Sequence, residues 1–250
     1  MSDFLLPSGF KDQIFEEASI EHKFKNKIIN LFQQNGYILV KPPLIEYTNQ
    51  TNINNAFIIK EKKELKDFII RNDITLQVTR LANSRLKNKV RPLKLCYYGE
   101  VVRKKGSILR PERQFLQVGA ECIGEDSYLA DLEMLDLAYQ SLILVGIKNI
   151  SIDLSSFAFL DYLLKRIKNK KDLSKITSFI RRKDSTNCFK YLDSSLHDYT
   201  NYLLLCTGNL EEKKEILNKL VNDQYTKLAA EQLLSIYSNF LSKYFNVIIL

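Results

Sequence analysis

Two long β-rich stretches stand next to each other in the chain, at residues 92–103 and 113–123, and only the polar segment 104–112 separates them. Strands joined by a connection of this length pair side by side in the antiparallel direction. The sequence therefore predicts an antiparallel hairpin. We expect the first part of the chain to be an α+β fold in which helices flank this sheet.

Further elements are predicted on both sides of the hairpin. Between residues 16 and 35, apolar residues from Ile20 to Phe32 recur at three- and four-residue steps, which indicates one buried helix face. Gly36 is expected to end this helix, since glycine readily takes the left-handed conformation of a helix cap. We also expect strands at 37–40, 68–70 and 149–154, and helices at 75–87 and 127–145.

The character of the chain changes after Leu154. Residues 156–245 carry periodic Leu, Ile, Phe and Tyr and are expected to be helical throughout, while the final segment 246–250, NVIIL, is typical of a strand. We therefore expect three parts: a core at 1–154, a helical insertion at 155–245 and the beginning of a returning strand at 246–250.

Composition argues against several classes of function. The net charge is +8, but the basic clusters at 60–66, 165–171 and 181–183 are short and lack interleaved aromatic residues, so solvated helix faces are favoured over a nucleic-acid surface.

No run of 18 apolar residues and no secretion signal is present, and we expect a cytoplasmic protein without membrane contact. Four widely spaced Cys and two His argue against a metal site and against imidazole chemistry. Neither a P-loop nor a dinucleotide fingerprint occurs, and no cofactor is expected.

Three segments carry the informative motifs: LFQQNGYILVKPPLIEY at 31–47, RNDITLQVTR at 71–80 and YYGEVVRKKGSILRPERQFLQVGAECIG at 97–124. Their order and spacing resemble the core of class II aminoacyl-tRNA synthetases, in particular the histidyl branch. Together with LPSGFKD near the N-terminus, they are similar to the ATP phosphoribosyltransferase regulatory subunits, a non-catalytic family within that branch. The resemblance in motifs covers residues 5–154. The helical part that follows resembles the family only in its position, where the family has an insertion.

This resemblance implies a class II synthetase-like antiparallel sheet flanked by helices, and a role in the first step of histidine biosynthesis. The implied partner is the short-form catalytic ATP phosphoribosyltransferase subunit, which the regulatory subunit activates in a hetero-oligomer. Histidine is the implied allosteric feedback effector, and the first motif is the implied homodimer contact.

Two departures from the synthetases indicate that the chain has no independent enzymatic activity. The synthetases carry Arg-x-Glu after the first strand of the hairpin, where this chain has Arg103 followed by Lys104 and Lys105. They also carry Arg or His four residues before the conserved Phe, where this chain has Pro111 before Phe115. Amino-acid adenylation requires several fixed cations around a triphosphate. We therefore expect no adenylation and no catalytic residues.

The residues expected to bind an amino acid are better represented in this sequence than those expected to bind ATP. A bound amino acid needs acceptors for its ammonium group and a cation for its carboxylate. The candidate acceptors are Asp73, Gln117 and Glu121, with Thr75 as a hydroxyl partner, and Arg103 is the candidate cation. Gln117 and Glu121 are four residues apart on one strand, so they face the same side, as does Phe115.

Other interpretations of these residues stay open. Glu121 and Arg103 are equally suited to a structural salt bridge across the hairpin. The chain as a whole is also compatible with a divergent histidyl-tRNA synthetase fragment that forms histidyl-adenylate, or with a stand-alone protein that binds an amino acid or tRNA.

Overall fold

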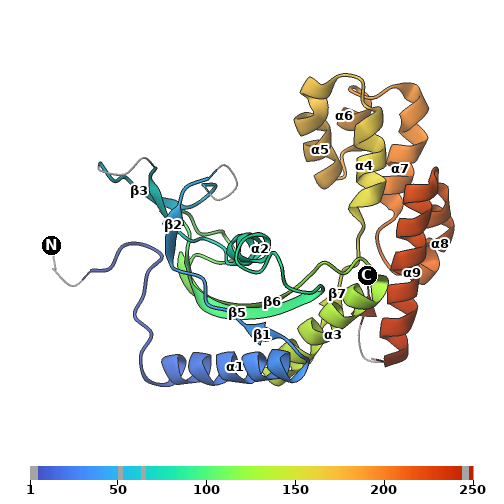
Figure 1. The fold of residues 1–250 in the computed structure, drawn as a ribbon. Coiled ribbons are helices and arrows are strands. Elements are labelled where there is room, and N and C mark those ends of the chain that lie inside the picture. Colours follow the sequence, from blue (N-terminus) through green and yellow to red (C-terminus); the bar gives the residue numbers. More distant parts are fainter. Residues whose placement is uncertain (1–4, 50–52, 63–65, 244–247, 250) are drawn as a thin grey trace. The chain divides into compact units, whose positions relative to one another are not determined.

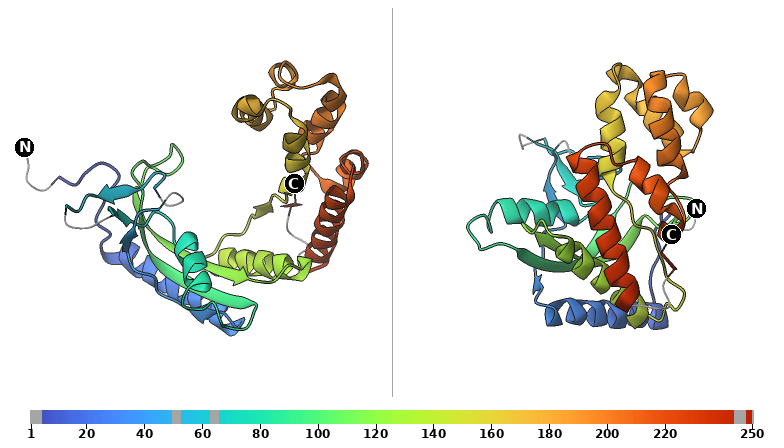
Figure 2. Two further views of the ribbon diagram at one scale, coloured as in Figure 1. Left: turned by 45° about the horizontal axis from the view of Figure 1, so that its top comes forward. Right: turned by 90° about the vertical axis from the view of Figure 1, so that its right-hand side faces the viewer.

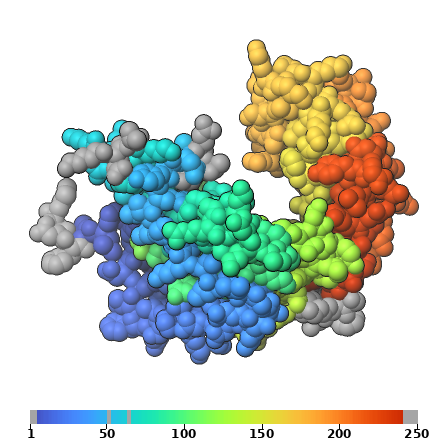
Figure 3. Space-filling model, viewed as in Figure 1, coloured from blue at the N-terminus to red at the C-terminus, as the bar shows by residue number. Residues whose placement is uncertain are grey.

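The computed structural model describes residues 5–49, 53–62, 66–243 and 248–249. The chain divides into two compact units, Met1–Ile147 and Lys148–Leu250, and each is described by itself. Figure 1 labels the helices and strands of both units, Figure 2 gives two further views of the ribbon, and Figure 3 is a space-filling view. The division falls before the expected boundary at Leu154, because the strand at Ser151–Ile152 pairs within the second unit.

The predicted hairpin is the centre of the first unit. Strand β5 (Leu93–Val102) pairs antiparallel with β6 (Gln114–Ile123), from Leu93 opposite Ile123 to Val102 opposite Gln114. The short strand β1 (Ile38–Leu39) joins β5 in the parallel direction, so the strand order is β1-β5-β6. The hairpin and the strand expected at 37–40 are therefore confirmed.

One face of the hairpin packs against two long helices. Helix α1 (Phe15–Gln34) and helix α3 (Tyr128–Leu144) contribute Ile29, Phe32 and Leu137 to a buried cluster with Cys96. Because side chains alternate along a strand, the even-numbered residues Tyr98, Val118 and Ala120 join the same cluster. Both helices were predicted from their periodicity.

Ile20 departs from the predicted buried helix face. It is half-exposed, although it belongs to the same apolar stripe of α1 as the buried Phe32. The buried cluster begins further along the helix, at Ile28 and Ile29. The N-terminal end of the apolar stripe, at Ile20, is therefore uncovered within a single chain.

The opposite face of the hairpin carries helix α2 (Thr75–Asn83), and Figure 1 shows α1 and α2 on either side of the strands. Ile74 and Val78 pack there against the odd-numbered residues Leu95, Tyr97 and Val101. The helix ends before the expected limit at residue 87. Its last turn is followed by tight turns in which the Ser84 hydroxyl donates to the carbonyl of Arg80.

A second small sheet was only partly predicted. Strand β4 (Phe68–Ile70), expected from its residues, lies between β2 (Ile45–Tyr47) and β3 (Phe57–Ile59), and both neighbours are antiparallel to it. The two outer strands, Ile45–Tyr47 and Phe57–Ile59, were not predicted.

The second unit is helical, as predicted, apart from one pair of short strands. Strand β7 (Ser151–Ile152) pairs in the parallel direction with β8 (Ile248–Ile249), which confirms strand character within the expected segment 246–250; its other residues lie outside the described ones. The helices are α4 (Phe157–Arg166), α5 (Leu173–Arg181), α6 (Ser185–Phe189), α7 (His197–Leu205), α8 (Leu210–Lys219) and α9 (Gln224–Lys243). Single turns of 3₁₀ helix occur at Lys170–Asp172 and Ser194–Leu196.

The core of the second unit is formed mainly by α4, α7, α8 and α9, around the buried Phe159, Leu163, Leu217 and Leu220. Within the described part of the chain, no helix is both long and apolar enough to span a lipid bilayer.

Candidate amino-acid pocket

The N-terminus of α2 meets strand β6 at the expected acceptor residues. The carboxylate of Asp73 accepts a hydrogen bond from the backbone N–H of Thr75 at 2.7 Å, which organises the first turn of the helix. The side-chain oxygen of Gln117 accepts from the backbone N–H of Ile74 at 3.0 Å. Gln117 therefore fixes the start of α2 on the sheet, and three of the predicted residues lie together.

Tyr97 joins the remaining acceptor to this group. Its phenol donates to Glu121 Oε1 at 3.0 Å, and the Thr75 hydroxyl lies 3.0 Å from the same phenolic oxygen. Since the phenolic hydrogen points to Glu121, the Thr75 hydroxyl is the donor to Tyr97. The result is a chain of hydrogen bonds from Thr75 through Tyr97 to Glu121, on the odd-numbered face of the hairpin.

Gly119 explains how Tyr97 reaches across the strand pair. The two residues are directly opposite in the register, and a Cβ on Gly119 would lie 2.5 Å from the phenolic oxygen of Tyr97. The absence of a side chain therefore allows the ring to lie over β6. Tyr97 was missed by sequence reasoning, because its role depends on the glycine opposite it and the sequence does not show the register.

The phenol of Tyr97 is held in its neutral form. Burial raises its pKa, the Thr75 hydroxyl acts in the opposite direction, and the negative charge of Glu121 raises it further. Tyr97 consequently remains a hydrogen-bond donor to Glu121 at neutral pH, and one oxygen of the Glu121 carboxylate is occupied in this way.

Arg103 is the predicted site residue that the structure does not bring to this cluster. It follows the end of β5, where its guanidinium carbon lies 4.9 Å from the ring centroid of Phe115. Glu121 pairs with Leu95, eight positions before Arg103, which corresponds to about 27 Å along a straight strand. No ion pair joins Glu121 to Arg103 among the described residues. The structural salt bridge that the sequence left open as an alternative is therefore not formed.

A second cation, Arg71, lies on the same face and was also missed. It is buried, with Nε donating to the carbonyl of Glu100 at 2.7 Å and Nη1 to the carbonyl of Pro42 at 3.0 Å. A Cβ on Gly99, which pairs with Gln117, would collide with Nη2 of Arg71. Burial lowers the pKa of Arg71, and the carboxylates of Glu100 and Glu46 counteract this effect.

The loop of the hairpin contains the residues that depart from the synthetases. Lys105 is exposed, and its backbone exchanges hydrogen bonds with the side chain of Asn55 at 2.9 and 3.1 Å. Pro111 is exposed as well. The guanidinium of Arg110 instead lies over the ring of Phe115, 3.7 Å from its centroid. A cation therefore lies next to Phe115, but it comes from Arg110, the residue before Pro111.

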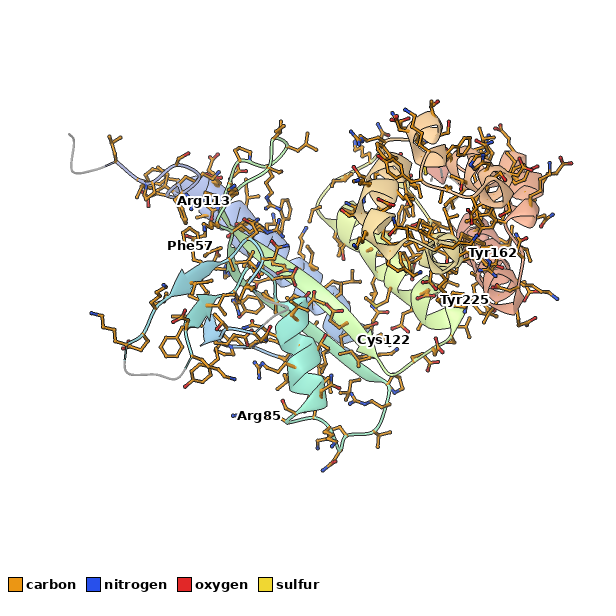
Figure 4. The ribbon with its side chains drawn as sticks, turned by 90° about the horizontal axis from the view of Figure 1, so that it is seen from above. Phe57, Arg85, Arg113, Cys122, Tyr162 and Tyr225 are labelled. Carbon is orange, nitrogen blue, oxygen red and sulfur yellow. The ribbon has the colours of Figure 1, made fainter. Side chains whose placement is uncertain are left out.

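Arg113 connects this loop to the N-terminal LPSGFKD segment. Its guanidinium lies 4.9 Å from the ring centroids of both Phe10 and Phe57, and it donates to the carbonyl of Ser8 at 3.0 Å. Figure 4 labels Arg113 next to Phe57. The backbone N–H of Arg113 also donates to the carbonyl of Gly9 at 2.8 Å. The N-terminal motif is thereby anchored beside the start of β6.

The model of the histidyl-tRNA synthetase family matches residues 9–245, which make up most of both units. The chain belongs to the histidyl-tRNA synthetase family. Within that family it is similar to proteins named ATP phosphoribosyltransferase regulatory subunit, which confirms the resemblance read from the motifs. The one from Paramagnetospirillum magneticum is 38% identical over 158 residues, covering 60% of this chain and 42% of the relative. The chain spans about half the length of the curated relatives it matches.

Solved structures of the histidyl-tRNA synthetase family share the fold. A Bacillus halodurans protein described as an ATP phosphoribosyltransferase regulatory subunit/histidyl-tRNA synthetase has a TM-score of 0.78 at 22% identity, covering 99% of this chain and 68% of that one. A chain of the ATP phosphoribosyltransferase complex of Thermotoga maritima has a TM-score of 0.67 at 19% identity, covering 92% and 79%. The predicted α+β, class II synthetase-like fold is confirmed.

Proposed function

We propose that this chain acts as a regulatory subunit of ATP phosphoribosyltransferase, in the first step of histidine biosynthesis, and has no enzymatic activity of its own. One contrast within the first unit carries the proposal. The acceptor residues for an amino acid are joined by hydrogen bonds to the start of α2 and to Tyr97, whereas Lys105 and Pro111 stand where a synthetase has its ATP ligands. The site is therefore suited to sensing an amino acid rather than to activating it.

Histidine is the proposed effector. Its ammonium group would be held by Asp73, Gln117 and Glu121, with Thr75 as a hydroxyl partner, and its carboxylate by a cation. Arg103 is the expected cation, and it would approach the carboxylate from the Gln117 end of the pocket, because Gln117 pairs with Gly99, four positions before Arg103. Feedback then requires that histidine binding and binding of the catalytic subunit change each other's free energy by the same amount.

The proposed partners are a short-form catalytic ATP phosphoribosyltransferase subunit and a second copy of this chain. For the homodimer, the support is uncovered apolar surface in the first motif and in helix α1, which leads into it: Ile38 of the motif is 68% exposed and Ile20 of the helix is 50% exposed. A two-fold contact would cover the same patch on both chains. We place the complex in the cytoplasm, and the four free cysteines are in keeping with a reducing compartment.

The test of this function is reconstitution with the short-form catalytic subunit of the same organism. We expect the two chains to coelute in size-exclusion chromatography, and the rate of pyrophosphate release from ATP and phosphoribosyl pyrophosphate to rise over that of the catalytic subunit alone. Because this chain carries a charge of +8, the experiment is repeated at about 0.5 M salt, where non-specific ionic contacts are screened. Absence of both coelution and stimulation would contradict the proposal.

The second candidate is a divergent synthetase fragment, which the family membership and the cation of Arg110 next to Phe115 favour. This alternative is tested by histidine-dependent exchange of pyrophosphate into ATP. We expect no exchange, because the carboxylate and the cation that would hold ATP are replaced by Lys105 and Pro111. Robust exchange would promote the synthetase interpretation over the regulatory one.

A further inference from the structure

The second unit contains a cavity of about 830 Å³ between its helices. Its lining extends from Asp153 to Leu233 and takes residues from α4, α5, α7, α8 and α9, so the cavity is formed within one unit. Small-molecule sites in proteins typically measure roughly 300–1,000 Å³. The cavity therefore has the size of a binding site, and it is separate from the candidate pocket in the first unit.

Much of the lining is apolar, and it includes the leucine side chains, called here the leucine wall, of Leu203, Leu204, Leu210, Leu217, Leu220 and Leu233. Leu217 and Leu220 belong to the buried core, whereas the other four are only partly buried. The core of the unit is thus incompletely packed on this side, and apolar surface faces the cavity. An aliphatic group that displaced water from this wall would be stabilised by the hydrophobic effect.

Two lysines give the cavity a cationic side. Lys183 Nζ donates to the hydroxyl of Thr207 at 2.9 Å, and Lys213 is half-buried in the first turns of α8. Neither lysine has a carboxylate within 4.0 Å among the residues that the structure describes. Asp153 is the acidic residue in the described lining. The cations in the described lining therefore exceed the anions, and neither lysine has a carboxylate partner there.

We propose that this cavity binds a small aliphatic carboxylate. The hydrocarbon chain lies along the leucine wall and the carboxylate lies between Lys183 and Lys213. The leucine side chains alone would accept any aliphatic molecule, so the two lysines, which have no carboxylate partner, determine the sign of the charge. This proposal is independent of the proposed regulatory function, because the two sites share no residue.

The test is calorimetric titration of the 250-residue chain with three probes of equal chain length: octanoate, octan-1-ol and octylammonium. We expect octanoate to bind about tenfold more tightly than the alcohol, as one charge-assisted hydrogen bond would provide, and octylammonium to bind most weakly. Equal affinity for the acid and the alcohol, a preference for the ammonium, or no binding of octanoate would each overturn the proposal.

Substitutions locate the binding. The double variant Lys183→Gln/Lys213→Gln should lose the preference for the acid over the alcohol, while the control Lys214→Gln should keep it, because Lys214 is exposed and lies outside the described lining. Leu233→Phe should fill the cavity and weaken octanoate binding about tenfold, with a thermal melt to show that the variant is folded. Leu203→Phe serves if Leu233→Phe does not fold. Unchanged octanoate affinity in a folded filling variant would place the probe elsewhere and overturn the proposal.

Discussion

The phenol of Tyr97 donates a 3.0 Å hydrogen bond to the carboxylate of Glu121, and the glycine opposite Tyr97 in the hairpin makes this contact possible. The phenol lies between the Thr75 hydroxyl and Glu121, so it links the N-terminus of α2 to the far part of β6. We expect this arrangement to affect the packing and the pH dependence of the first unit and the proposed binding of histidine, and each can be measured separately.

Glu121→Gln is expected to weaken histidine binding without unfolding the chain. The amide oxygen can still accept from Tyr97, but the negative charge for the ammonium group is lost. Removing one partner of a buried charge pair typically costs about 2–5 kcal/mol, which is roughly a 30- to several-thousand-fold loss of affinity. Calorimetric titration with histidine measures the loss, thermal melts report the fold, and Glu125→Gln, at an exposed carboxylate nearby, is the control. Failure of the unmutated chain to bind histidine would defeat the pocket.

Gly119→Ala is expected to destabilise the first unit by about 1–3 kcal/mol. The added Cβ would lie 2.5 and 2.6 Å from the hydroxyl oxygen and the adjacent ring carbon of Tyr97, so the ring would have to leave its position over β6. Urea denaturation measures the free energy of unfolding. In a Tyr97→Leu background the same substitution should cost less, because the clash is gone. An equal cost in both backgrounds would mean that Gly119 is required for a reason other than Tyr97.

Tyr97 should also make the first unit less stable at alkaline pH. Burial raises the pKa of its phenol above that of the unfolded chain, so the folded state holds the proton more tightly. The corresponding stability is complete below about pH 10, the ordinary pKa of tyrosine, and is lost as the pH rises above that value. Comparing urea denaturation at pH 8 and pH 11, we expect Tyr97→Phe to lose less stability than the unmutated chain. Tyr225→Phe, at an exposed tyrosine of the second unit, should behave like the unmutated chain.

The proposed homodimer predicts a specific effect of Ile38→Lys. Ile38 is 68% exposed in the single chain and would be covered in a two-fold contact through the first motif, where a lysine ammonium is unfavourable. Light scattering at micromolar concentrations should give a dimer for the unmutated chain and a monomer for the variant. Val90→Lys, at a residue that is 88% exposed outside this motif, should remain dimeric. A monomeric unmutated chain would remove the basis of the dimer.

The hairpin, its flanking helices and the face shared by Gln117 and Glu121 could all be predicted from the sequence. These features are local, because the two-residue period of a strand and the three- to four-residue steps of a helix can be recognised from residues that are neighbours in the sequence. The shared face follows from parity alone, and the register places Phe115 on it as well. The motifs likewise identified three acceptor residues and the hydroxyl partner Thr75, which lie together in the structure.

Other features depended on contacts between distant residues and could be decided only by the tertiary structure. The pairing of Tyr97 with Gly119 requires the register, and the exposure of Ile20 requires knowing where α1 leaves the sheet. The position of Arg103, away from Glu121, follows from the length of β5 rather than from any local pattern. The strand β7 belongs to the second compact unit because it pairs with β8, almost a hundred residues later in the chain. Periodicity determines which face a residue occupies, but only the three-dimensional fold determines which residue it meets there.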